Sequence, residues 1–307
     1  PVLGGLDVLR EIRSRWPALP VVVLTGVREA GPAELEAVSR GAQRWLTKLP
    51  HEGNMVNAIG WVRERLAPCL RQVIAQRAAP AAVAAEVRRP AAPAAPPAMP
   101  VRAARRPSFP DLLAIGTSTG GPDALDALLR ELPADFPLPI LIVQHMPKEF
   151  TGLLAQRLTQ RTPFVAAEGR AGAPLLPGQV WIAPGNRHML VQRNGNDLQL
   201  QLSDAAPENS FRPSVDVLFR SLARLSGVRT LAVVLTGMGQ DGLEGGRLIV
   251  AAGGDVLAQD EASSVVWGMP GAVVRANLAS AVVPLSAMAD TIMQRTRGSR
   301  ALLSQTL

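Results

Sequence analysis

The sequence predicts an α/β protein, with a doubly wound, mostly parallel sheet and an antiparallel hairpin in its larger second part, preceded by a partial α/β segment. Two observations predict this class. Apolar runs of strand length alternate with amphipathic helical stretches through residues 109–307, which favours parallel strands covered on both faces. Asn194-Gly195 lies between two alternating runs, a pattern typical of a tight hairpin over 188–202.

The elements follow from hydrophobic periodicity and from turn and capping residues. In the second part we expect strands at 111–117, 139–144, 229–236, 255–259 and 278–283, and helices at 122–132, 149–160, 241–252, 268–275 and 286–296. In residues 1–70 we expect helices at 6–14, 32–40 and 55–66 and strands at 21–25 and 43–47.

Between these parts lies a segment of different composition, residues 71–108, which is rich in Ala, Pro and Arg. It has little to bury, so it predicts a mobile linker. The chain carries a net charge of +7, but residues 71–107 alone hold seven arginines against Glu86. This segment has no aromatic residue on which a base could stack, so the basic charge does not indicate nucleic-acid binding.

Cysteine and histidine are scarce. The single cysteine, Cys69, excludes an intrachain disulfide and favours a reducing, cytoplasmic setting. With three histidines in all, a zinc cluster is not expected. No apolar run reaches the roughly 18 residues of a membrane span, and the chain does not start with a signal-peptide pattern, so no membrane insertion is expected.

The stretch after the first strand of the second part has a glycine-framed serine, Gly116-Thr117-Ser118-Thr119-Gly120. A phosphate-binding P-loop would need a lysine after Gly121, and Ser118 stands where a dinucleotide fingerprint needs its middle glycine. The pattern fits a nucleophile elbow, G-x-S-x-G between strand and helix. The alternative is that Ser118 or Thr119 only caps the helix that follows.

A nucleophilic serine needs a base, and that base an orienting acid. The second part has two histidines, and His145 is favoured over His188 because it ends an apolar strand and so shares a sheet edge with Ser118. Asp241, in a glycine-rich turn after another apolar run, is the candidate acid. Each has a plainer interpretation: a hydrogen-bonded structural histidine, and an aspartate that caps helix 241–252.

Six blocks of the second part together resemble the catalytic domain of CheB-type chemotaxis protein-glutamate methylesterases. They are IGTSTGGPDAL (115–125), QHMP (144–147), APGNRHM (183–189), FRPSVDVLF (211–219), LTGMGQDG (235–242) and EASSVVWGMPGAV (261–273). The resemblance covers 109–307 and implies Ser118 as nucleophile, His145 as base and Asp241 as its orienter, with backbone amides near Thr119 and Met238 binding the oxyanion. It implies no metal or organic cofactor. Relatives often have a histidine where this chain has Phe211, so a substrate contact at that position is in doubt.

Residues 1–70 resemble the C-terminal portion of a response-regulator receiver domain, with Thr25 and Lys48 at the positions of the family's switch threonine and lysine. The usual Lys-Pro step is altered to Lys48-Leu49-Pro50. The combined resemblance implies methyl-accepting chemoreceptor cytoplasmic helices as the substrate and a chemotaxis histidine kinase as a partner of the receiver part. These residues contain no phosphoacceptor aspartate, so we expect partly or fully constitutive activity. The alternative is a catalytically inactive adaptor that binds receptors or kinases.

Overall fold

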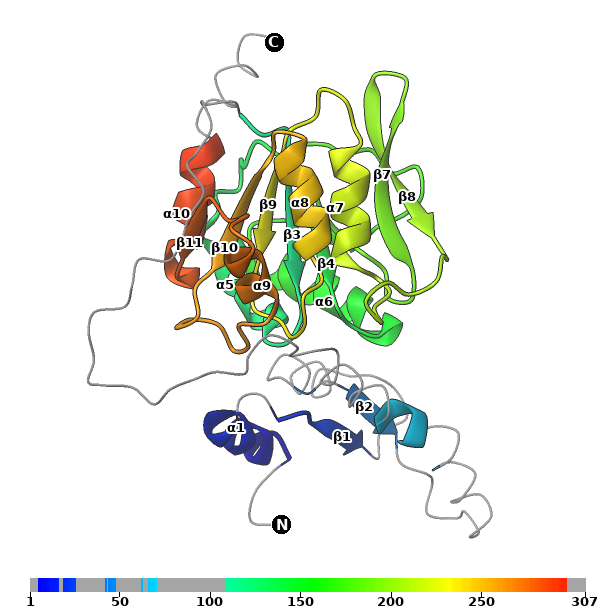
Figure 1. Cartoon of the computed structure of the whole chain (residues 1–307). Coiled ribbons are helices and arrows are strands. Elements are labelled where there is room, and N and C mark those ends of the chain that lie inside the picture. The colour runs from blue at the N-terminus through cyan, green and yellow to red at the C-terminus, as the bar shows by residue number, and fades with distance from the viewer. Residues whose placement is uncertain are drawn as a thin grey trace, which may run out of the picture.

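The computed structural model describes residues 5–16, 19–25, 42, 44–47, 62, 66–70 and 109–296. Its main feature is a seven-stranded sheet in which all neighbouring strands are parallel (Figure 1). In spatial order the strands are β11 (Ala281–Val283), β10 (Asp255–Gln259), β9 (Thr230–Val234), β3 (Leu112–Thr117), β4 (Ile140–Gln144), β6 (Val180–Ile182) and β5 (Ala166–Glu168). The central strands β9, β3 and β4 are adjacent, so their carboxyl ends meet at one edge.

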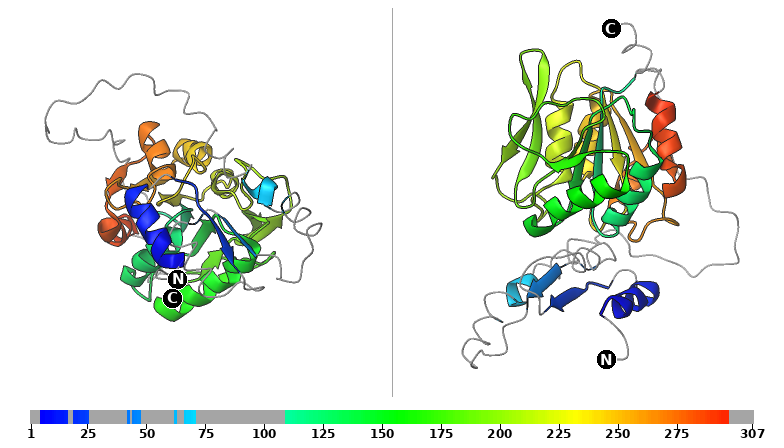
Figure 2. Two further views of the ribbon diagram at one scale, coloured as in Figure 1. Left: turned by 90° about the horizontal axis from the view of Figure 1, so that it is seen from below. Right: turned by 180° about the vertical axis from the view of Figure 1, so that it is seen from behind.

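Helices cover both faces of this sheet, as Figures 1 and 2 show. One face carries α5 (Gly121–Glu131), α6 (Lys148–Arg161) and α10 (Leu285–Thr296), and the other carries α7 (Val215–Ala223), α8 (Leu243–Ala251) and α9 (Met269–Arg275). The alternation of β3 explains the two layers: Leu113 and Ile115 pack into the core under α5, whereas Leu112 and Ala114 pack into the core under α7.

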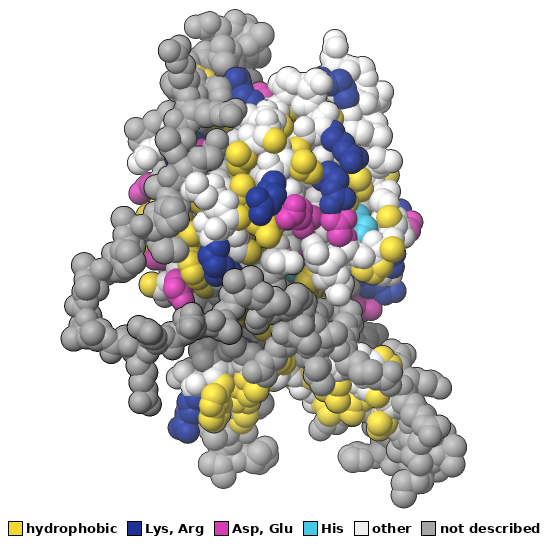
Figure 3. Space-filling view, in the orientation of Figure 1, with side chains coloured by type: hydrophobic (Ala, Val, Ile, Leu, Met, Phe, Trp, Pro, Cys, Tyr) yellow, Lys and Arg dark blue, Asp and Glu magenta, His cyan; other side chains and the backbone are white. Residues whose placement is uncertain are grey.

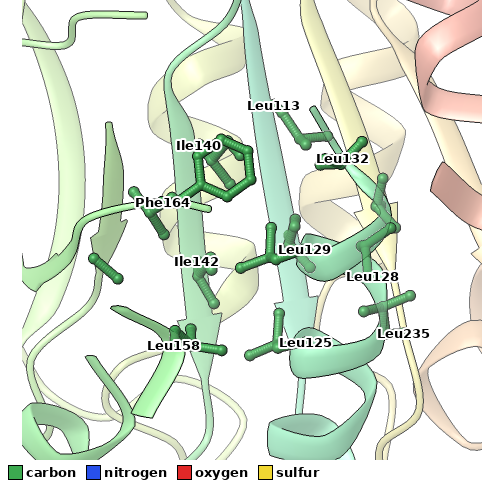
Figure 4. Packing of buried hydrophobic residues seen from close by; sticks show 14 of the residues in the cluster. Leu113, Leu125, Leu128, Leu129, Leu132, Ile140, Ile142, Leu158, Phe164 and Leu235 are labelled. Atoms are coloured by element: carbon green, nitrogen blue, oxygen red, sulfur yellow. The ribbon is translucent and has the colours of Figure 1, made fainter. Parts of the chain in front are cut away.

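The core under α5 is close-packed and apolar (Figure 4). Leu125, Leu128 and Leu129 of α5, with its C-cap residue Leu132, recur at helical spacing and are buried against the sheet. This packing fixes the start of α5 relative to the end of β3. The turn between them is therefore fixed by the buried strand β3 before it and the buried helix α5 after it.

The predicted strands and helices of 109–307 are all present, with ends shifted by a few residues. The hairpin is confirmed as β7 (His188–Asn194) and β8 (Asp197–Ser203), but it forms a two-stranded sheet of its own and packs through β7 on α7. Three elements were not predicted: β5, β6 and α7. Strands β5 and β6 have only three residues each, too few to show a period.

The first part contains α1 (Gly5–Arg15) and a parallel pair, β1 (Val22–Thr25) and β2 (Arg44–Thr47), all close to the predicted ranges. The expected helix at 32–40, nearly all of that at 55–66, Lys48 and the linker lie outside the described residues. In the described part of the chain, no helix combines the length and apolar character that a membrane crossing requires.

The charged side chains over α7 and α8 are mixed in sign. Figure 3 shows Lys and Arg interspersed with Asp and Glu on the face that those helices cover. Ion pairs such as Arg220–Glu208 and Arg247–Glu244 account for part of this mixing.

Candidate active site

The carboxyl ends of β9, β3 and β4 bring three predicted residues to one edge of the sheet. Ser118 directly follows β3, His145 directly follows β4, and Asp241 lies in the loop between β9 and α8. The loops are tied together by backbone hydrogen bonds: Ser118 N–H donates to Thr236 O, and His145 N–H donates to Thr117 O. The parallel order of the strands thus explains why residues far apart in sequence meet here.

The turn that carries Ser118 is tightly constrained. Gly120 has φ of 79°, which L side chains rarely adopt, and a side chain at Gly116 would collide with Val215. Gly120 is also the N-cap of α5, and no side chain caps this helix. Ser118 and Thr119 therefore do not serve as the cap. The backbone of Ser118 is held by its hydrogen bond to Thr236, and its side chain is not used to cap α5.

Gln144, the last residue of β4, links the serine loop to the histidine loop. Its side-chain amide donates to Ser118 O at 2.9 Å and to His145 O at 3.1 Å. The residue is fully buried. Sequence reasoning missed this role, although Gln144 stands in the QHMP block beside His145.

His145 and Asp241 are in direct contact. His145 Nε2 lies 2.7 Å from Asp241 Oδ2, and both side chains are nearly inaccessible, at 3% and 0% exposure. The other ring nitrogen, Nδ1, is buried and has no hydrogen-bond partner within the described residues, Ser118 included. The carboxylate thus places the donor proton on Nε2, and Nδ1 is the atom available to take a proton.

Asp241 caps a different helix from the one it precedes. Helix α8 begins at Leu243 with Gly242 as its N-cap, whereas the Asp241 carboxylate accepts hydrogen bonds from Val215 N–H at 2.7 Å and Asp216 N–H at 3.0 Å, the first amides of α7. Ser214 Oγ donates to it as well, at 2.8 Å. The expectation that Asp241 opens helix 241–252 is corrected accordingly.

These contacts decide the charge of Asp241. Burial alone would raise the pKa of Asp241, but the hydrogen bond and charge of His145, with the amides of Asp216 and Val215, outweigh it and hold the pKa at about 2. Asp241 is therefore a fixed anion beside the imidazole. Such a charge both orients the ring and stabilises the imidazolium that forms when it takes a proton.

His188 has a different environment. Its Nδ1 accepts a hydrogen bond from Ser214 N–H at 3.2 Å, and its Nε2 lies 3.1 Å from Ala206 O. These partners require a neutral ring with the proton on Nε2, and the residue is 1% exposed. His188 is thus hydrogen-bonded to Ser214 and Ala206, and no hydrogen bond joins it to Asp241 among the described residues.

Phe211 covers His145. The two rings stack with centroids 3.8 Å apart and planes 5° apart. Sequence reasoning placed Phe211 at a doubtful substrate position and missed this contact. It also missed Asn209, Ser214 and Asp216, which surround Asp241. One signal was present for Ser214: a serine directly before an apolar, helix-like run is typical of a helix start.

Two backbone amides near Ser118 remain without an internal acceptor. Neither Thr119 N–H nor Met238 N–H donates a hydrogen bond within residues 109–296. The Met238 loop lies close to the serine, since a side chain at Gly237 would approach Ser118 Cβ to 2.8 Å. Free backbone amides near the serine are available to a developing oxyanion.

The amino-acid sequence of this chain is similar to those of known proteins. The pattern of the CheB methylesterase family matches residues 113–292. The chain belongs to the CheB methylesterase family. It is 41% identical over 301 residues to the protein-glutamate methylesterase/protein-glutamine glutaminase of Trichodesmium erythraeum, covering 96% of this chain and 83% of the relative. The protein of the same name from Nocardioides sp. is 42% identical over 304 residues, covering 98% and 81%.

A solved CheB structure supports the fold as well. The crystal structure of the Thermotoga maritima CheB methylesterase catalytic domain is 36% identical, with a TM-score of 0.59, and it aligns with 61% of this chain and 99% of that domain. The sequence matches to the CheB relatives cover more of the chain than residues 109–307, so they extend into the first part.

Proposed function

We propose that this chain is a serine hydrolase that removes methyl esters from glutamate side chains of chemoreceptors, with release of methanol, and that it also deamidates receptor glutamines. The observation that carries the proposal is the 2.7 Å contact between His145 and Asp241 at the strand edge where Ser118 emerges. The named activities of the CheB relatives point to the same reaction.

In this proposal Ser118 Oγ attacks the γ-carbonyl carbon of the ester while His145 Nδ1 takes the hydroxyl proton. The Nδ1 atom has no competing partner among the described residues. Free enzymes often form the serine–histidine hydrogen bond only when substrate is bound. Asp241 keeps the Nε2 proton in place and stabilises the imidazolium.

The tetrahedral intermediate then collapses. Its oxyanion is bound by the amides of Thr119 and Met238, which have no internal acceptor in the described catalytic part. The C–O bond to the methoxy group breaks, and His145 returns its proton to form methanol. Water next hydrolyses the γ-glutamyl ester of Ser118 with His145 again as base, leaving glutamate and free enzyme.

Deamidation uses the same steps with ammonia in place of methanol, because the carbonyl carbon and the oxyanion are equivalent in an amide. The side chains of this route are sufficient for acyl transfer, so we assign no cofactor to it. The substrate we propose is the cytoplasmic helical segment of a methyl-accepting chemoreceptor. A chemotaxis histidine kinase is the proposed partner of the first part.

The deciding experiment is methanol release from a chemoreceptor fragment methylated at its glutamates. Ser118→Ala should lower turnover by roughly four or more orders of magnitude, since the nucleophile is lost. A fluorophosphonate probe should label the wild-type chain and spare Ser118→Ala. A wild-type chain that neither releases methanol nor reacts with the probe would instead favour the inactive adaptor.

Regulation by the first part is tested by removing residues 1–107. Unchanged steady-state turnover would show that residues 1–107 do not inhibit the catalytic part. A large rise after removal would show that the first part inhibits the active site.

A further inference from the structure

A second buried carboxyl group, Asp216, lies beside Asp241. It is 1% exposed, and Asp241 is fully buried. Asp241, which precedes α8, accepts hydrogen bonds from the backbone amides of Val215 and Asp216 at the start of α7. Asp216, which lies in α7, accepts hydrogen bonds from the backbone amides of Gly242 and Gly245 at the start of α8. The two helix starts are therefore joined by exchanged caps.

One side chain bridges the two acids. Asn209 Nδ2 lies 2.9 Å from Asp216 Oδ2 and 3.3 Å from Asp241 Oδ1. A side-chain amide nitrogen carries two hydrogens, so Asn209 can donate one to each carboxyl group. The amide nitrogen is the end of Asn209 that faces both carboxyl groups, so it offers a donor to each of them.

The pairing of two buried acids raises the question of which one is ionised. Two nearby carboxylates cannot both hold their charge easily, and one of them tends to keep a proton. No Lys or Arg of the described residues donates to either acid; the nearest arginine on α7, Arg220, pairs with Glu208. Burial and the charge of Asp241 raise the pKa of Asp216 to about 7, whereas the pKa of Asp241 is lowered to about 2, so Asp241 is the acid that stays ionised.

The turn formed by residues 208–211 holds the side-chain amide of Asn209 beside the two acids. Asn209 and Ser210 both have positive φ, 52° and 69°, and Glu208 and Phe211 close the turn with two hydrogen bonds of 2.8 and 3.0 Å. Asparagine tolerates this conformation better than most residues. The same turn leads to Phe211, which stacks on His145. The turn 208–211 thus touches both the acid and the base.

We propose that Asn209 is a positioning residue of the hydrolysis, whose side-chain amide bridges Asp216 and Asp241 and so keeps the ionised Asp241 aimed at His145 beside a second buried acid. This inference rests on the proposed function. It assigns Asn209 a role through Asp241 and no contact with substrate. The expected signature is a fall in kcat with an unchanged KM.

The test compares three variants of the full chain in the methanol-release assay. Asn209→Gly removes the amide but keeps a residue that favours positive φ, and kcat should fall about tenfold, as expected for the loss of a hydrogen bond to a charged group. Asn209→Asp replaces the donor with a third acid, and kcat should fall on the order of 100-fold. Ser210→Gly is the control, since its exposed side chain makes no hydrogen bond within the described residues, and it should match the wild type.

Thermal unfolding and KM complete the test. The inference holds if both Asn209 variants keep KM within twofold and stay folded at the assay temperature while kcat falls in the stated order. It is overturned if kcat is unchanged, or if KM alone rises, which would indicate a substrate contact. Ser118→Ala in the same assay reports on the proposed function separately: wild-type activity that needs Ser118, together with unaffected Asn209 variants, would reject this inference only.

Discussion

The ring of Phe211 lies parallel to the imidazole of His145, with 3.8 Å between centroids. One face of the imidazole is thereby closed by an apolar surface while its edge faces Asp241. The ring is fixed in position and partly shielded from water. A base held in this way loses little entropy when it takes up the serine proton.

Phe211→Leu should lower kcat about fivefold, since a stacked aromatic pair is worth on the order of 1 kcal/mol beyond its buried area. Phe211→His should retain activity, because an imidazole ring can stack on His145 as the phenyl ring does. Steady-state kinetics between pH 5 and 9 check both. A Phe211→Leu enzyme that equals the wild type would show that stacking does not matter.

Substitutions of the two histidines, His145 and His188, should differ in their effect on kcat. His145→Ala removes the base and should lower kcat by three or more orders of magnitude. It should also lower the free energy of unfolding, because the buried carboxylate of Asp241 loses its partner. His188→Ala breaks one buried and one partly buried hydrogen bond and leaves a cavity, so it should lower the free energy of unfolding by about 2–4 kcal/mol. Urea unfolding and kcat for the folded fraction measure the two effects. A larger kcat loss in His188→Ala would reverse the assignment.

Asp241→Asn tests the orienting acid. The two carboxylate oxygens accept different amides of α7, Val215 N–H at Oδ2 and Asp216 N–H at Oδ1, so an asparagine can keep only one of these bonds. With its amide group toward His145, it would favour the wrong tautomer of the imidazole. We expect kcat to fall roughly 10⁴-fold with the fold retained. Circular dichroism serves as the check on folding, and a loss below tenfold would remove Asp241 from the mechanism.

Gly237→Ala tests the close packing behind the nucleophile. The new methyl group would lie 2.5 Å from Met269 Sδ, 2.8 Å from Ser118 Cβ and 3.0 Å from Ser118 N. Because backbone atoms are involved, Ser118 should shift, and kcat should fall at least tenfold. Gly246→Ala is the matched control, since its methyl group would meet neighbours only at 3.7 Å or beyond. Equal activity of the two variants would contradict this account.

Asp216 should make the stability of the fold depend on pH. Burial and the charge of Asp241 raise its pKa to about 7, so the folded state holds a proton that the unfolded chain releases near pH 4. This contribution to stability is present below pH 4 and is lost as the pH rises through 7. Asp216→Asn should therefore remove a decline in the urea midpoint between pH 4 and 7. A parallel pH dependence of wild type and variant would count against it.

The sequence indicated much of this protein because its strongest patterns are local. Apolar runs marked the long strands, and the glycines around Ser118 marked the turn after β3. The edge shared by Ser118, His145 and Asp241 followed from the parallel order of strands. Asn209 and Asp216 could not be found in this way. Their importance depends on how the turn 208–211 folds over α7, and neither stands at a strand end.

Asp241 and His145 are 96 positions apart, and the chain between them includes the whole hairpin. The entropic cost of closing a loop grows only slowly with its length, so an insertion in this segment should lower the free energy of unfolding only a little. At its tip, a side chain on Gly195 would meet open space. A fluorescent reporter domain grafted at this tip should therefore leave catalytic turnover intact, which offers a labelling handle for following the protein.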